Sequence, residues 1–247
     1  MRVAIAGKGG AGKTTISALL ARLAARAGKS TVAVDADANP NLAPALGVPY
    51  DLAEKLAPVP SSVVSRRLGG AGLTEPIEAI LDQYSVRGPD GVRLMLMGAP
   101  KHAEEGCMCA AHAVVSALLD DLGNDRDRFV VVDMEASPKH PSRGTIRHVD
   151  MALLIAEPYY RSLETVRRMG LLVAELGVPD IAVVANKVRS STDDEAVAEF
   201  CLRHGFELAG TVPWSDAVVE ADRERVPVAD WPAPSPKPWL GSAVSVP

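Results

Sequence analysis

A nine-residue stretch near the start of the chain has the residue types and spacing of a phosphate-binding loop. Residues 7–15 read G-K-G-G-A-G-K-T-T, which contains the pattern G-x-x-x-x-G-K-[ST] between an apolar run and a helical pattern. The loop N–H groups and the helix N-terminus would bind an anion, with Lys13 reaching the β- and γ-phosphates and the Thr14 hydroxyl ligating Mg²⁺. The alternative is a glycine-rich turn without a ligand. The residues expected to contact a nucleotide are Gly9, Gly10, Ala11, Gly12, Lys13, Thr14 and Thr15.

Acidic residues follow two of the predicted strands. Asp35-Ala36-Asp37 and Asp133 each come directly after an apolar run. Parallel α/β sheets bind ligands at the carboxyl ends of their strands, so these carboxylates are expected beside the phosphate loop. Asp133 fits a Walker B pattern, with its carboxylate facing the Mg²⁺ shell through water, and Asp35 is expected to hold the following loop. In the alternative interpretation, Asp35 and Asp37 only form the turn before Asn39-Pro40.

Two cysteines separated by one residue, Cys107 and Cys109, precede a predicted helix. This position favours the thiolate form, because the helix N-terminus stabilises negative charge. Two thiolates bind a soft or borderline metal ion but cannot complete a tetrahedral site, whereas a symmetric dimer would supply four. The alternative is that both cysteines are small buried apolar residues.

The elements that must position these residues alternate regularly. Nearly continuous apolar runs, typical of parallel strands covered on both faces, alternate with helical patterns. The sequence therefore predicts an α/β fold with a single doubly wound, mostly parallel sheet and helices on both faces. We expect one domain over residues 1–225 and a proline-rich, irregular tail over residues 226–247. The strands are expected at 3–6, 31–35, 92–98, 129–133, 152–156, 181–185 and 208–212.

Composition limits the function classes. The chain has 247 residues, of which 47% are hydrophobic and 4% aromatic, and its net charge of −5 argues against a generally basic nucleic-acid-binding surface. The sequence has no apolar run long enough to cross a bilayer, no leader pattern, and no basic amphipathic helix in its tail. We therefore expect a cytoplasmic protein that binds neither nucleic acid nor membrane. Three cysteines in such a chain indicate thiols or metal ligands, not a disulfide framework.

The second lysine of the loop, Lys8, makes the stretch resemble the deviant Walker A signature of the MinD/ParA/nitrogenase-iron-protein group. The resemblance implies an ATPase that dimerises with ATP, in which Lys8 crosses to the partner's nucleotide and Asp37 contacts Mg²⁺-bound or attacking water. The pair Asn186-Lys187 is similar to the base-recognition motif of this group, because the amide can donate and accept at the adenine edge and the lysine stem can cover the ring. The loop containing Pro213 is expected to wall the base pocket.

Within this group the sequence resembles the CooC-type ATPases, the nickel-insertion accessory proteins of carbon monoxide dehydrogenase. The resemblance implies Ni²⁺ or Zn²⁺ between two Cys107/Cys109 pairs of a homodimer, and a metalloenzyme client such as carbon monoxide dehydrogenase. It spans residues 1 to about 225. The stretches that carry it are 8–15, 35–37, 105–111, 133–136, 143–145, 157–158, 161–165 and 186–188.

Some residues depart from the group's pattern. Ser137 stands in the second switch where the group usually has glycine, which could stiffen that segment. Residues 134–136 hold no cysteine, so a shared iron–sulfur cluster of the nitrogenase type is not expected. Two alternatives remain open. One is a ParA/MinD-like partitioning or positioning ATPase with structural cysteines, and the other is a non-hydrolysing regulatory subunit.

Overall fold

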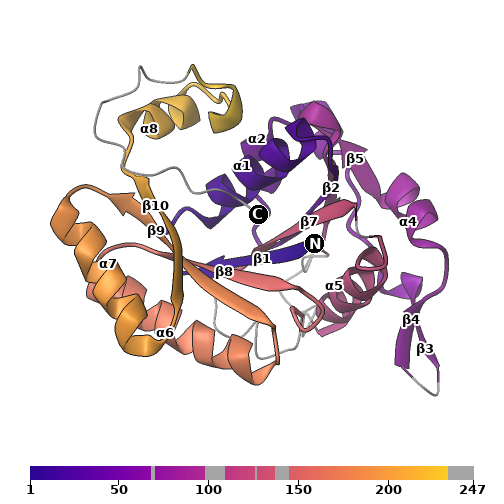
Figure 1. The fold of residues 1–247 in the computed structure, drawn as a ribbon. Coiled ribbons are helices and arrows are strands. Elements are labelled where there is room, and N and C mark those ends of the chain that lie inside the picture. Colours follow the sequence, from indigo (N-terminus) through magenta and orange to yellow (C-terminus); the bar gives the residue numbers. More distant parts are fainter. Residues whose placement is uncertain (68–69, 98–108, 126, 137–144, 233–247) are drawn as a thin grey trace.

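A central sheet organises the chain, as a computed structural model shows for residues 1–67, 70–97, 109–125, 127–136 and 145–232. In these residues the sheet has eight strands in the order β10-β9-β8-β1-β7-β2-β6-β5, and only the β5–β6 pair is antiparallel. Helices cover both faces (Figure 1). The predicted fold class, a doubly wound and mostly parallel sheet, is confirmed.

The strands of this sheet are short, and all except β5 lie close to the predicted positions. Their bounds are β1 Arg2–Gly7, β2 Ser30–Ala36, β5 Ser85–Arg87, β6 Arg93–Leu96, β7 Arg128–Met134, β8 Met151–Ala156, β9 Asp180–Val188 and β10 Glu207–Pro213. The helices are α1 Lys13–Arg26, α2 Leu42–Leu46, α3 Tyr50–Ala53, α4 Ile77–Tyr84, α5 Cys109–Leu122, α6 Tyr160–Glu175, α7 Ser191–His204 and α8 Asp216–Arg223. The described residues also contain the short 3-10 helices η1 Ser61–Val63, η2 Pro89–Gly91 and η4 Val228–Asp230.

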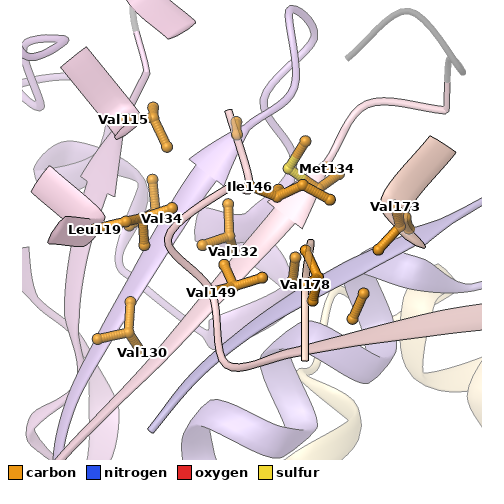
Figure 2. Close-up of a cluster of buried hydrophobic side chains, with 14 of the residues drawn as sticks. Val34, Val115, Leu119, Val130, Val132, Met134, Ile146, Val149, Val173 and Val178 are labelled. Atoms are coloured by element: carbon orange, nitrogen blue, oxygen red, sulfur yellow. The ribbon is translucent and has the colours of Figure 1, made fainter. Parts of the chain in front are cut away.

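Successive residues of each central strand point to opposite faces and form two separate cores. Val3 and Ile5 of β1 join a cluster with α1 and α2, whereas Ala4 and Ala6 join a second cluster with helices α4 to α7. Figure 2 shows part of this second cluster, where valines of β2 and β7 meet Val115 and Leu119 of α5. Because both faces are covered, the central strands are mostly apolar, and the polar residues Asp35 and Asp133 stand near their carboxyl ends.

The order of the strands gathers the chemically distinctive residues at one edge. β1 lies between β7 and β8 and runs parallel to both, so the loops after these strands meet at the carboxyl edge. Asp35 of β2 and Asp133 of β7 are register partners on adjacent strands. This is the edge at which open α/β sheets bind ligands.

Several elements were not predicted. The edge strand β5 pairs antiparallel with β6, and a separate antiparallel hairpin consists of β3 Val64–Arg67 and β4 Gly70–Leu73. The short helices α2 and α3 occupy a region that the sequence left without assignment. Across the described ranges, none of the helices combines the length and the apolar character that a bilayer crossing requires.

Candidate functional site

The loop after β1 leaves the first turn of α1 open to an anion. Gly12 is the N-cap of α1 in the left-handed conformation (φ 97°), and a glycine has no side chain with which to cap the helix. The first-turn N–H groups of a helix have no partners within the helix, so those of α1 remain available to phosphate oxygens. Gly10 also has positive φ (81°), and the Ala11 N–H donates to the Lys8 carbonyl at 3.1 Å. The backbone thus leaves N–H groups of the first helical turn without helical partners, and phosphate binding at this loop stays a prediction.

Lys13 lies buried beneath this loop, with 7% of its surface exposed. Its Nζ is 3.4 Å from the Lys8 carbonyl oxygen, to which it donates. Burial lowers the pKa of Lys13, and the nearby carboxylates of Asp133 and Asp37 act in the opposite direction. The ammonium group therefore lies between the loop and the acidic residues, where it is placed to interact with phosphate oxygens.

The predicted carboxylates come together beside Lys13. Asp133 is 1% exposed, and its Oδ1 accepts a hydrogen bond from the Ser17 hydroxyl at 3.0 Å. Burial raises its pKa, while hydrogen bonds from Thr14 and Ser17 oppose the change. The Thr14 hydroxyl is therefore near the Walker B carboxylate. A hydroxyl and a carboxylate are ligands suited to Mg²⁺, whose coordination is usually completed by substrate phosphates and water.

Asp35 differs in role from its neighbour Asp37. Asp35 is fully buried and accepts hydrogen bonds from the Leu42 N–H at 2.8 Å and the Asp37 N–H at 3.2 Å, which agrees with a loop-holding role. Burial raises its pKa to about 7, although both hydrogen bonds favour the charged form. Asp37 is half-buried and accepts the Asn39 N–H at 2.8 Å, so its carboxylate remains at the rim of the site.

Asn186 contacts the phosphate loop directly. It is buried at the end of β9, and its Nδ2 donates to the Ala11 carbonyl at 2.6 Å. A Cβ on Gly12 would lie 2.3 Å from this nitrogen, so the close approach of β9 to the loop requires glycine at position 12. The amide predicted to read the base thus also fastens the loop, a role that the sequence did not indicate.

A chain of polar contacts crosses the mouth of the site. Lys187, at positive φ (60°), donates to the Gly10 carbonyl and forms an ion pair with Glu157 at 3.1 Å. Glu157 accepts the Tyr159 hydroxyl at 2.8 Å, and Lys8 Nζ lies 3.3 Å from that hydroxyl and 5.4 Å from the ring centroid. Sequence reasoning did not give Glu157 or Tyr159 a place in the site, although both follow the carboxyl end of β8.

A cavity of about 560 Å³ opens from the loop along α1. Gly10, Gly12, Thr14 and Thr15 line its inner end, and Lys187 also contributes. Asn186 and Pro213 are not among its lining residues, so their predicted contacts with the base remain predictions. Pro213 instead ends β10 beside Val188. The outer wall comes from α8 and residues 225–229, which the sequence analysis assigned to no site.

The predicted metal site at the cysteines falls largely outside the described part of the chain. Cys107 and Ser137 lie outside the described residues, and Cys109 is described only as the first residue of α5. Because α5 connects β6 to β7, two parallel strands, it begins at the carboxyl edge of the sheet. Within the described ranges, His, Cys, Asp and Glu side chains form no group of three or more that could hold a metal ion.

Comparisons with known proteins agree with this geometry. The family model described as the CobQ/CobB/MinD/ParA nucleotide binding domain matches residues 3–228. The chain is 36% identical over 232 residues to the carbon monoxide dehydrogenase accessory protein CooC of Rhodospirillum rubrum, covering 90% of this chain and 87% of that protein. It is 34% identical over 233 residues to an uncharacterized ATP-binding protein of Methanocaldococcus jannaschii, with 90% and 88% coverage.

A solved structure supports the fold. The MinD cell division protein of Aquifex aeolicus superposes with a TM-score of 0.65 at 20% identity, over 92% of this chain and 88% of that one. The sequence comparisons confirm the resemblance to CooC-type ATPases over most of the chain.

Proposed function

Because the chain belongs to the CobQ/CobB/MinD/ParA nucleotide-binding family and is an ATPase, we propose that it acts as an ATP-dependent dimeric switch in metallocentre assembly. Similarity over 90% of the chain to a carbon monoxide dehydrogenase accessory protein carries this proposal. The Cys-x-Cys pair supports a metal cargo. The likeness to MinD lies below 25% identity and so supports the fold alone.

The phosphate end of the site supplies positioning and positive charge, the main requirements of phosphoryl transfer to water. The first-turn N–H groups of α1 and the Lys13 ammonium group bind the β- and γ-phosphates. Thr14 and Asp133 would hold Mg²⁺, which would supply neutralisation of the phosphate charge. Asp37 orients the attacking water from the rim of the site. Gly9 and Thr15 bind through their backbone N–H groups, whereas Ala11, whose N–H donates to the Lys8 carbonyl, shapes the loop around the phosphates.

Lys8 is proposed to join two copies of the chain around their nucleotides. In the single chain its ammonium group contacts Tyr159, whose side chain is 41% exposed. A cation–aromatic contact at an exposed position contributes only about 0.5–1 kcal/mol. The triphosphate of a second copy carries several negative charges and can replace this contact. The contact made by Lys8 would thereby depend on the presence of both ATP and the second copy.

The metal cargo is assigned to Cys107 and Cys109 of both copies. Four thiolates complete a tetrahedral site for Zn²⁺, and the CooC resemblance adds Ni²⁺ as a candidate. The first residue of α5 lies at the same sheet edge as the nucleotide loop. Loss of the γ-phosphate would release Lys8, loosen the dimer and open the shared thiolate site. The client would be a metalloenzyme such as carbon monoxide dehydrogenase.

Light scattering with and without ATP tests the role of Lys8. The Lys8→Ala variant should stay monomeric with saturating ATP and Mg²⁺ while still binding ADP, because its own phosphate loop is intact. Lys29→Ala, an exposed lysine beyond the other end of α1, is the matched control and should dimerise like the wild type. Unchanged dimerisation of Lys8→Ala would remove the residue from this role.

Metal analysis tests the cargo. The wild-type dimer should bind one Ni²⁺ or Zn²⁺ per two chains, and the Cys107→Ala/Cys109→Ala variant none. Cys201→Ala is the control, because Cys201 is buried and burial raises its pKa to about 11. Metal binding that survives the double substitution would contradict the assignment. Salt-sensitive, ATP-dependent DNA binding would instead support the ParA/MinD-like alternative.

A further inference from the structure

A buried arginine joins three segments that are distant in the sequence. The Arg22 side chain, on α1, is 3% exposed. Its Nη1 donates to the Leu46 carbonyl at the end of α2 at 2.8 Å, and its Nε donates to Asp90 in η2. Its two terminal nitrogens donate to both carboxylate oxygens of Asp230 in η4, at 3.0 and 2.7 Å. A bidentate pair of this kind is strong and geometrically specific.

A second arginine, one turn further along α1, also contacts η2 and η4. Arg26 donates to Asp90 at 2.8 Å, to Asp230 at 3.0 Å and to the Ala229 carbonyl at 3.2 Å. We call Arg22, Arg26, Asp90 and Asp230 the latch. Two guanidinium groups face two carboxylates, so their charges balance. This leaves the short C-terminal segment fixed to the helix that begins at the phosphate loop.

The segment that the latch holds, residues 226–231, is called the strap. It folds on itself through hydrogen bonds from the Asp230 and Trp231 N–H groups to the Pro227 carbonyl, at 2.9 and 3.1 Å. A Cβ on Gly47 would lie 2.7 Å from Cγ of Pro227, so the strap also packs closely against the end of α2. The predicted tail therefore includes, in its described part, a defined and docked element.

The strap closes the cavity at the end opposite the phosphates. Thr15, Ala18 and Leu19 line the cavity along α1, leading away from the carboxylates beside Lys13. Its outer wall includes Val226 and Val228 of the strap. With a triphosphate at the loop, this cavity offers room for the ribose and base, and valine side chains suit the faces of an aromatic base. The latch thus holds in place the strap residues that a nucleoside in the cavity would contact.

We propose that the latch positions the strap as the wall of the nucleoside subsite, which makes Asp230 a positioning residue for the base and ribose. The inference rests on nucleotide binding at the phosphate loop, as in the proposed function. It predicts an effect on binding without an effect on chemistry. Interactions that are equal in the ground state and the transition state change KM and leave kcat unchanged.

The Asp230→Asn variant tests the latch, because it keeps the size of the side chain and removes its charge. Its Kd for ADP and its KM for ATP should both rise about tenfold at unchanged kcat, as expected from the loss of a charge-assisted bidentate pair. Asp230→Glu, which restores the charge, should recover part of the affinity. Glu199→Gln, which breaks an exposed ion pair with Arg203 on α7, is the control and should change neither constant.

Two results would overturn the inference. One is unchanged affinity for ADP and ATP in Asp230→Asn, and the other is a fall in kcat as large as that in kcat/KM, which would indicate damage to the phosphate end. Should Asp230→Asn fail to fold, Arg26→Gln can be used instead, because it removes only the exposed arginine of the latch. Unchanged affinity, or an equal fall in kcat and kcat/KM, would again overturn the inference. Absence of ATP turnover in the wild type would count against the proposed function. The role of the latch would then be tested by the Kd for ADP alone.

Discussion

Replacing Gly12 by alanine should destabilise the fold in two ways, through backbone strain and through a steric clash with Asn186. The residue has φ 97°, and an alanine in the left-handed region costs about 1–2 kcal/mol. The added Cβ would also lie 2.3 Å from Nδ2 of Asn186. That amide is buried and donates to the Ala11 carbonyl at 2.6 Å, so it cannot move aside without losing its hydrogen bond. Displacing a buried polar group in this way costs about a further 1–3 kcal/mol.

Gly10→Ala is the matched variant, because Gly10 has φ 81° and its added Cβ would have no atom within 4 Å. Denaturant unfolding without nucleotide should show Gly12→Ala less stable than Gly10→Ala by about 1–3 kcal/mol. In a chain of this length each kcal/mol lowers the Tm by about 2–4 °C. The Asn186→Ala substitution should destabilise the wild-type protein. It should have little effect in the Gly12→Ala variant, because the alanine has already displaced the Asn186 amide.

The two substitutions should be coupled by at least about 1 kcal/mol in a double-mutant cycle. Equal stabilities of Gly10→Ala and Gly12→Ala would refute the reasoning, as would additive effects of Gly12→Ala and Asn186→Ala. Either result would mean that the amide of Asn186 can move away from the loop without cost.

Two further predictions concern acid stability and packing. Hydrogen bonds from Arg22 hold the pKa values of Asp90 and Asp230 below the ordinary 3.8. The two carboxylates therefore stabilise the folded state fully above pH 3.8. This stabilisation is lost as the pH falls through the lower pKa values that the two groups have in the folded protein. Denaturant titrations from about pH 5 to pH 2 should therefore show a smaller acid loss for Asp230→Asn than for the wild type, and equal losses would contradict the ion pairing. Gly170→Ala in α6 should destabilise the protein in thermal unfolding, because its Cβ would lie 2.4 Å from Cζ of Phe206 and overpacking of about 1–3 kcal/mol exceeds the helix-propensity gain of about 1 kcal/mol. A raised Tm would show that the Phe206 ring can move aside.

Local patterns in the sequence were sufficient for the fold class and for the phosphate loop. A strand covered on both faces is mostly apolar, so the central parallel strands are visible in the sequence as apolar runs. The loop needs glycines, a lysine and a hydroxyl within nine consecutive residues, and no distant partner is required to recognise them. The same holds for Asp35 and Asp133, because each stands near the carboxyl end of its strand, directly after an apolar run.

Only the tertiary structure decided which distant residues support that loop. Asn186 fastens the Ala11 carbonyl from 175 residues away, and Asp230 reaches Arg22 across 208 residues. Such pairs leave no periodic pattern, because each partner looks like an ordinary polar residue until the chain has folded. The antiparallel strand β5 was missed for a related reason, since its three residues are too few to show a period. Short-range pattern thus identified the phosphate loop, and long-range complementarity determined which residues support the loop and line the cavity beside it.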